Sequence, residues 1–201
     1  MRLVTAASGF LAVSLFSAIG GPSLSSAIFA PESRTTDLVG RSCQVEPGQG
    51  RLGSGQEWVK RCPGLGGARV TVTADDAAVA LGFEWSAKEK TDEVLRNWGL
   101  GYKLEWRGFR TARGFEPYAA TIRLLFNEGS EPADRPVLAV LRVKRGEACL
   151  VGIVDVAANP DGYDTARRLA DQRAPGFACG RDTPRLEGAP TMRATSILNN
   201  S

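Results

Sequence analysis

Two cysteines, Cys149 and Cys179, bracket the stretch that most constrains the fold of this chain. The nearly unbroken apolar run from Cys149 to Ala157 predicts a buried strand. The sequence Asn-Pro-Asp at 159–161 predicts a helix start, because Asn suits the N-cap, Pro the first helical position and Asp the positive helix end. A strand of about 8 residues advances about 26 Å, and a helix of about 15 residues returns about 22 Å. Cys179 is therefore expected beside Cys149, within reach of a disulfide.

Two further cysteines, Cys43 and Cys62, bring the count to an even number. In an exported protein this is typical of disulfides, and four cysteines allow three pairings. We expect the sequential pairing, Cys43–Cys62 and Cys149–Cys179, because it closes the shortest loops. Close Cys-x-x-Cys pairs are missing from the sequence, so the cysteines do not indicate a metal site.

Histidine does not occur among the 201 residues. Its absence excludes Ser-His-Asp and Cys-His catalysis, histidine-ligated zinc and a histidine pH switch. With the cysteines assigned to disulfides, we expect no catalytic residue, no cofactor and no transition metal.

Residues 1–27 are typical of a secretory signal peptide. Arg2 precedes an apolar core at 10–19, and Ser-Ser-Ala at 25–27 provides a cleavage signal of small residues. The core is too short to cross a bilayer, and we expect no transmembrane segment in the mature chain. The sequence therefore predicts a periplasmic or secreted protein.

Cleavage after Ala27 leaves 24 basic and 22 acidic residues, a net charge of +2. Ala30 is the less favoured cleavage point because Pro31 would follow it. A charge so close to zero does not indicate a nucleic-acid or membrane partner.

Alternation of apolar and polar residues predicts several strands before Cys149. They are expected at 43–45, 57–62, 69–73, 79–85, 102–106, 118–126 and 137–144. A helix is predicted from Ser86 to Gly99, because Ser86 and Glu89 fit a capping box and the residues at 87, 91, 94, 95 and 98 share one helical face.

This order predicts an α+β fold, a mainly antiparallel sheet with two packed helices, the C-terminal one stapled by a disulfide. We expect a signal peptide at 1–27, a flexible leader at 28–41, a single domain at 42–182 and a loose C-terminal tail at 183–201.

Five segments together resemble a group of uncharacterised exported proteins of alphaproteobacteria. They are Cys-Pro-Gly-Leu-Gly-Gly at 62–67, Leu-Glu-Trp-Arg at 104–107, Ala-Ala-Thr-Ile-Arg at 119–123, Asp-Val-Ala-Ala-Asn-Pro at 155–160 and Ala-Arg-Arg-Leu-Ala-Asp at 166–171. The resemblance covers residues 43–182. It implies a periplasmic or secreted location and carries over no site residue.

The segment 105–115 interleaves arginines with aromatic residues. Its candidate ligand-binding residues are Arg107, Arg110, Arg113, Phe109 and Phe115. Guanidinium groups beside aromatic faces can hold an anionic glycan, a phosphate or a single strand of nucleic acid. The alternative is a structural loop, in which these arginines pair with Glu105 and Glu116.

Carboxylates beside predicted strands could act in pairs on a glycan, as in glycosidases. The candidates are Glu84, Glu105, Glu116 and Asp155. Asp155 interrupts an apolar run, so its structural alternative is to bind backbone N–H groups or an arginine near the helix start.

We therefore expect a non-enzymatic exported protein, a binding or envelope-interaction module. Its partner would be an envelope protein or an anionic glycan, and one specific form is an inhibitor of a cell-wall hydrolase. The alternative is a histidine-free, carboxylate-based hydrolase of envelope glycans.

Overall fold

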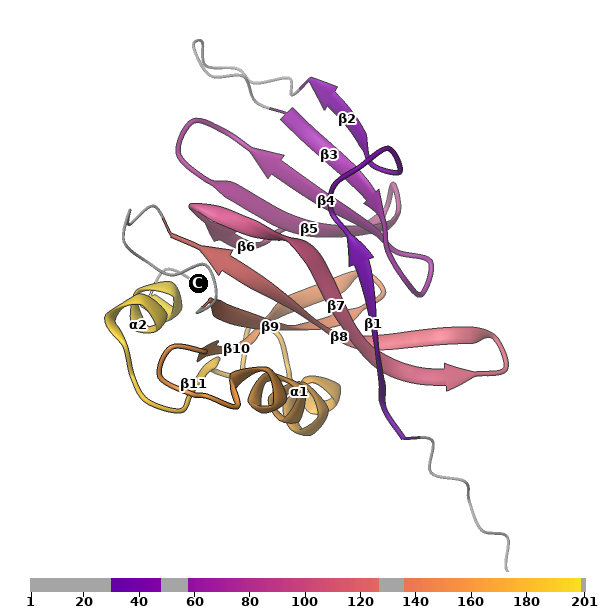
Figure 1. The fold of residues 1–201 in the computed structure, drawn as a ribbon. Coiled ribbons are helices and arrows are strands. Elements are labelled where there is room, and N and C mark those ends of the chain that lie inside the picture. The colour runs from indigo at the N-terminus through magenta and orange to yellow at the C-terminus, as the bar shows by residue number, and fades with distance from the viewer. Residues whose placement is uncertain (1–29, 48–57, 127–135, 200–201) are drawn as a thin grey trace, which may run out of the picture.

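The computed structural model describes residues 30–47, 58–126 and 136–199, which form two β-sheets and two α-helices (Figure 1). The five-stranded sheet runs in chain order through β2 (Gln44–Pro47), β3 (Trp58–Pro63), β4 (Arg69–Ala74), β5 (Val79–Ser86) and β6 (Glu89–Asn97). The six-stranded sheet has the order β1 (Glu32–Asp37), β7 (Gly99–Thr111), β8 (Gly114–Leu125), β9 (Val137–Lys144), β10 (Glu147–Asp155) and β11 (Arg185–Glu187). Neighbouring strands are antiparallel except β10 and β11, which are parallel.

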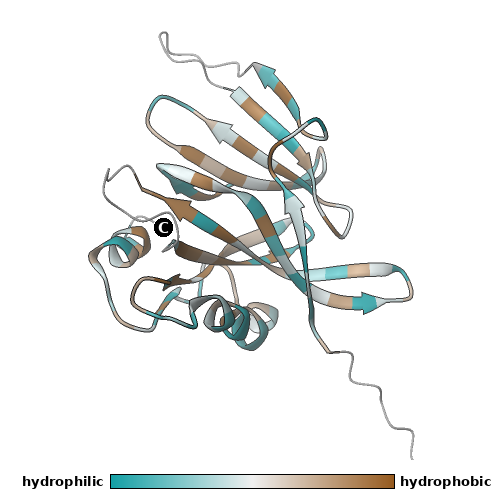
Figure 2. Ribbon diagram, viewed as in Figure 1, coloured by the Kyte–Doolittle hydropathy of each residue, from teal (hydrophilic) through white to brown (hydrophobic). Residues whose placement is uncertain are grey.

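The main hydrophobic core lies between the two sheets. Figure 2 shows hydrophilic and hydrophobic segments alternating along the strands of the five-stranded sheet, as expected when one face is buried. Phe83 of β5 and Trp106 of β7 are fully buried and meet edge to face, with ring centroids 5.6 Å apart. The indole N–H of Trp106 donates to Thr36 of β1 at 2.8 Å, which satisfies its polar group inside the core.

A second, smaller core lies on the other face of the six-stranded sheet, under the helix α1 (Gly162–Arg173). Ala166, Leu169 and Ala170 of α1 are buried there against β8, β9 and β10. β9 and β10 are covered on both faces, which explains their nearly continuous apolar sequences. The helix predicted after Asn159 is thus confirmed, although Asp161 stands at its N-cap.

Both predicted disulfides are present. Cys149 and Cys179 are joined with a Cα separation of 5.7 Å, and Cys43 and Cys62 with a Cα separation of 4.2 Å. The first staples the chain after α1 and the short helix η1 (Ala174–Gly176) to β10. The chain that follows α1 therefore returns to β10 near Cys149, as predicted from the lengths of the strand and the helix.

The helix predicted from Ser86 to Gly99 is wrong, because residues 89–97 form β6. The N–H of Glu89 does donate to the Ser86 hydroxyl at 3.2 Å, which is one of the two hydrogen bonds of a capping box, and that hydroxyl donates to the Glu89 carboxylate at 3.0 Å, but the two residues close the β5–β6 turn instead. Of the proposed helical face, Leu95 is buried and pairs with Leu81 of β5. Pairing with β5 has overridden the local helical pattern.

The ends of the expected domain also differ from the prediction. Within the leader expected to be flexible, β1 pairs with β7 from Glu32 to Asp37. Within the tail expected to be loose, β11 pairs with β10, and the helix α2 (Met192–Asn199) packs Ala194 and Ile197 into the main core. The fold is predominantly β, with helices as a minor part.

The predicted signal peptide at 1–27 lies outside the described residues, as do residues 48–57 and 127–135. Neither helix of the described chain has the length and apolar character that crossing a bilayer requires.

Candidate functional site

A groove of about 620 Å³ opens where the β7–β8 hairpin separates from β9, and we call it the basic groove. Its basic residues are Arg113, Arg142, Lys144 and Arg145. Its aromatic residues are Trp85, Phe109 and Tyr118. It is completed by Gly66, Glu116, Pro117, Val143 and Pro175. Its volume falls within the range of about 300–1,000 Å³ that is usual for ligand sites.

The groove exists because β8 and β9 diverge. The two strands pair with each other from Leu124–Val137 to Ala119–Arg142, and beyond that point β8 continues to Gly114 paired with β7 alone, and β9 continues to Lys144 paired with β10 alone. Pro117 has no N–H to offer a neighbouring strand. At Tyr118 the pairing of β8 with β7 skips one residue, which is a β-bulge and bends the strand. The β7–β8 hairpin consequently projects past the rest of the sheet (Figure 1).

Two of the four basic residues are held by carboxylates outside the groove. Arg142 donates to Glu147 at 2.9 Å and to the carbonyl oxygens of Ala174 and Pro175, and its side chain is only 14% exposed. Arg145 makes a bidentate ion pair with Glu89, with N–O distances of 2.8 and 2.7 Å. These arginines shape the groove and are already largely neutralised.

The other two basic residues are available to a ligand. Arg113 is 89% exposed and its nearest carboxylate, that of Glu116, lies 3.5 Å away. Lys144 is exposed and has neither an ion pair nor a side-chain hydrogen bond within the described part of the chain. The positive charge left uncompensated in the groove is therefore that of Lys144, reinforced by Arg113.

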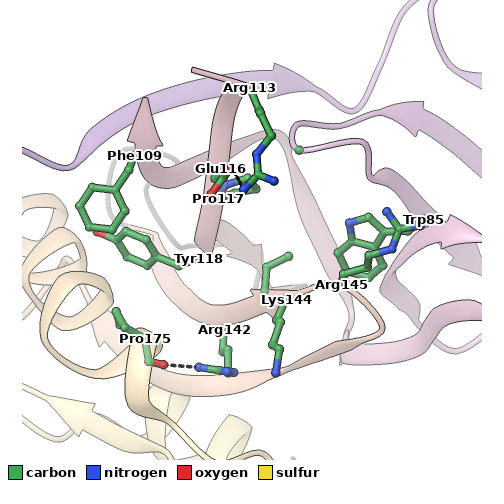
Figure 3. Close-up of a pocket in the computed structure, with 12 residues that line it drawn as sticks. Trp85, Phe109, Arg113, Glu116, Pro117, Tyr118, Arg142, Lys144, Arg145 and Pro175 are labelled. Carbon is green, nitrogen blue, oxygen red and sulfur yellow. Dashed lines mark hydrogen bonds and ion pairs between the residues drawn. The ribbon is translucent and has the colours of Figure 1, made fainter. Parts of the chain in front are cut away.

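The aromatic residues stand at opposite ends of the groove. Figure 3 shows Phe109 and Tyr118 together at one end and Trp85 beside Arg145 at the other, with Arg142 and Lys144 between them. The rings of Phe109 and Tyr118 have centroids 5.1 Å apart. Phe109 is 36% exposed, so part of its ring is accessible from the groove.

A charged cluster fixes the base of the hairpin against α1. Arg107 donates to both carboxylate oxygens of Asp171, at 2.7 and 2.8 Å, and the hydroxyl of Tyr118 donates to the same carboxylate. Burial acts to raise the pKa of Asp171, but the hydrogen bonds from Arg107 and Tyr118 outweigh it and the pKa is lowered. Burial, together with the hydrogen bond to Asp171, raises the pKa of Tyr118, so its hydroxyl remains a donor.

The five residues predicted as a ligand site do not stay together. Arg113 and Phe109 line the basic groove. Arg107 is committed to Asp171, and Arg110 approaches Glu32 at 3.6 Å. Phe115 is buried beneath the guanidinium of Arg34, 4.9 Å from the ring centroid. The segment 105–115 is mostly strand and not the loop of its structural alternative, so its alternate side chains point to opposite faces.

The four candidate carboxylates are separated, and each has its own partners. Glu84 accepts from Arg61 and Arg69, Glu105 from Ser33 and Arg167, and Glu116 from Thr111. Asp155 is fully buried and accepts from the backbone N–H of Ala157 and from Arg193, which confirms its structural alternative. Of these four carboxylates, that of Glu116 lines the basic groove.

Sequence reasoning missed most of the groove. Trp85, Tyr118, Arg142, Lys144 and Arg145 come from β5, β8, β9 and the β9–β10 turn. They carry no shared motif, and the order of strands in the sheets brings them together. The available signal is the run Arg-Val-Lys-Arg at 142–145, in which polar residues end an otherwise buried strand.

Among the described residues, no three His, Cys, Asp or Glu side chains cluster as metal ligands. Comparisons of the chain with family models, with curated proteins and with solved structures give no match.

Proposed function

We propose that this chain is a non-enzymatic exported binding module, located in the periplasm or secreted, which holds an anionic ligand of the bacterial envelope in the basic groove. The observation that carries the proposal is the exposed Lys144, unpaired within the described chain, facing a cavity flanked by partly exposed aromatic rings. Concave sites that combine apolar walls with a few placed charges are the usual form of a ligand site.

Binding fits the carboxylates better than catalysis does. A glycosidase places two carboxyl groups about 5–9.5 Å apart across the bond to be cleaved. Here Glu84, Glu105 and Asp155 are each paired with arginine, and Glu116 faces the groove beside Arg113. An arginine partner favours the charged form of a carboxyl group, which opposes its use as a general acid.

Export is supported by the two disulfides, because such bonds persist in oxidising compartments. The resemblance to exported alphaproteobacterial proteins and the features of residues 1–27 favour the same location. Sequencing the N-terminus of the protein from a periplasmic fraction of the native host should give Ile28. An N-terminus at Met1 in the cytoplasmic fraction would contradict the proposed location.

Retention on envelope material tests the binding function. Purified residues 28–201 are incubated with isolated envelopes of the native host, and the bound fraction is measured for the wild type, Lys144→Gln and Lys103→Gln. Both variants lose one exposed lysine, but Lys103 lies on β7 outside the groove and pairs with Asp37 at 3.8 Å. Loss of retention in Lys144→Gln alone supports the groove as the binding site, whereas equal retention of all three proteins contradicts it.

The same incubation separates the competing functions. Release of soluble sugar fragments by the wild type would show that the protein is the alternative hydrolase and not a binding module. If instead an added cell-wall hydrolase is slowed in proportion to the protein added, the module acts as an inhibitor of that enzyme.

A further inference from the structure

The volume and the lining residues of the basic groove indicate which chemical class of ligand it can bind. Its volume suits a chain of a few rings, whereas a stable protein partner usually needs about 800 Å² on each side. The side chains that Figure 3 places between the aromatic ends include the cationic Arg113, Arg142 and Lys144, which disfavours an uncharged acyl chain.

Flat aromatic faces at both ends of a groove suit sugar rings. The face of an aromatic ring carries partial negative charge, and the C–H groups on one face of a pyranose ring carry partial positive charge. Phe109 and Tyr118 offer such faces at one end and Trp85 at the other. The hydroxyl of Tyr118 is held by Asp171, which fixes the ring in place before any ligand arrives.

The cations between these ends select for charge on the sugar. Lys144 on β9 and Arg113 on the hairpin turn both line the groove, and in Figure 3 Arg113 extends from the hairpin while the Lys144 amine lies beside Arg142 on the other side. A carboxylate bound at either cation would receive charge-assisted hydrogen bonds. Glu116, the acidic residue among those lining the groove, weakens this attraction because it lies 3.5 Å from Arg113.

We propose that the basic groove binds a chain of acidic sugars, with sugar carboxylates bound by Lys144 and by Arg113 and sugar rings stacked on the aromatic side chains at its two ends. This inference rests on the proposed function and names the ligand class of the same site.

Titration calorimetry with a short oligogalacturonate tests the inference, with its methyl ester as the uncharged control. The free acid should bind and the ester should bind at least about tenfold more weakly, because one good charge-assisted contact is worth about 1.4 kcal/mol or more. Lys144→Gln should weaken binding of the acid about tenfold while Lys103→Gln leaves it within about twofold. Glu116→Gln should strengthen it severalfold.

A second pair of variants, one in the groove and one outside it, tests the aromatic part of the site. Phe109→Ala should weaken binding about tenfold, an effect of the size seen when an aromatic ring that stacks on a nucleic-acid base is removed. Tyr102→Ala removes an aromatic ring that is 68% exposed and lies outside the groove, and should have no effect. Unchanged circular dichroism spectra establish that each variant is folded.

The outcomes separate this inference from the function on which it rests. If envelopes retain the protein through Lys144 but the oligogalacturonate does not bind, the acidic-sugar inference is wrong and the binding function stands. Equal binding of polyglutamate, insensitive to Phe109→Ala, would assign the groove to an acidic protein. If neither envelopes nor sugars distinguish Lys144→Gln from Lys103→Gln, both proposals fail.

Discussion

Arg193 donates to both carboxylate oxygens of Asp155, at 3.0 and 3.2 Å, and joins the C-terminal helix α2 to the end of β10. Asp155 is the fully buried charged residue of the described chain, and Thr191 and the N–H of Ala157 also donate to its carboxylate. A charge removed from water needs such partners. The residue that interrupts the apolar run of β10 therefore anchors the last segment of the fold.

Arg193→Met should destabilise the protein by about 3–5 kcal/mol, because it leaves the buried carboxylate of Asp155 without its cation. The matched control is Arg168→Met, since Arg168 pairs with the exposed Asp161 at 2.9 Å. Exposed pairs are worth about 0–1 kcal/mol. Urea unfolding of both variants provides the comparison, and similar losses in the two would show that the Asp155 pair is not a buried anchor.

The packing of helix α2 can be tested by comparing two of its residues that lie about one and a half turns apart. Ile197 is 6% exposed and packs into the core between the sheets, whereas Met192 in the same helix is 92% exposed. Ile197→Ala should cost about 2–4 kcal/mol through the cavity it leaves, and Met192→Ala should stay within about 0.5 kcal/mol. Thermal unfolding that is equally insensitive to both changes would mean that the tail is loose in solution.

Features that depend on near neighbours in sequence could be predicted. The strand, helix and bridge between Cys149 and Cys179 follow from local periodicity and from lengths that return the chain to its start. The N-terminal hairpin follows in the same way from Cys43 and Cys62. Between Cys149 and Cys179 the chain forms one compact unit of strand and returning helix.

Features that depend on pairing across the sheets could not be predicted. Residues 89–97 have a helical pattern, but their register is set by β5, through pairs such as Leu81–Leu95. Arg107 has Glu105 close by in sequence, yet its partner is Asp171, 64 residues away. The basic groove is of the same kind, since Lys144 and Trp85 come from different sheets.

The cluster at the base of the hairpin should make stability depend on acid pH. The pKa of Asp171 is lowered in the folded protein, so its ionised form stabilises the fold above the unfolded pKa of about 3.9. That contribution is lost as the pH falls through the lowered, folded-state pKa. Asp171→Asn should therefore be less stable than the wild type at pH 7, and the difference should shrink on acidification below about pH 4.

The measurement is the urea midpoint of the wild type and of Asp171→Asn across this pH range. Asp92→Asn serves as the control, because the side chain of Asp92 is 71% exposed. A difference between wild type and Asp171→Asn that stays constant with pH would show that the ionised carboxylate does not hold the hairpin base.

The bridge between Cys149 and Cys179 can be removed with little disturbance to packing, because both cysteines are only partly buried. The double change Cys149→Ala and Cys179→Ala frees a loop with a sequence separation of 30 residues. On the loop-entropy estimate this lowers the free energy of unfolding by about 4 kcal/mol.

Helix α1 should nevertheless stay docked without the disulfide. Leu169 and its buried neighbours, together with the Arg107–Asp171 pair, still bind it to the sheet. We expect an unchanged far-ultraviolet circular dichroism spectrum with a lower urea midpoint. Loss of helical signal in the absence of urea would show instead that the disulfide, and not the packing under α1, holds the helix on the sheet.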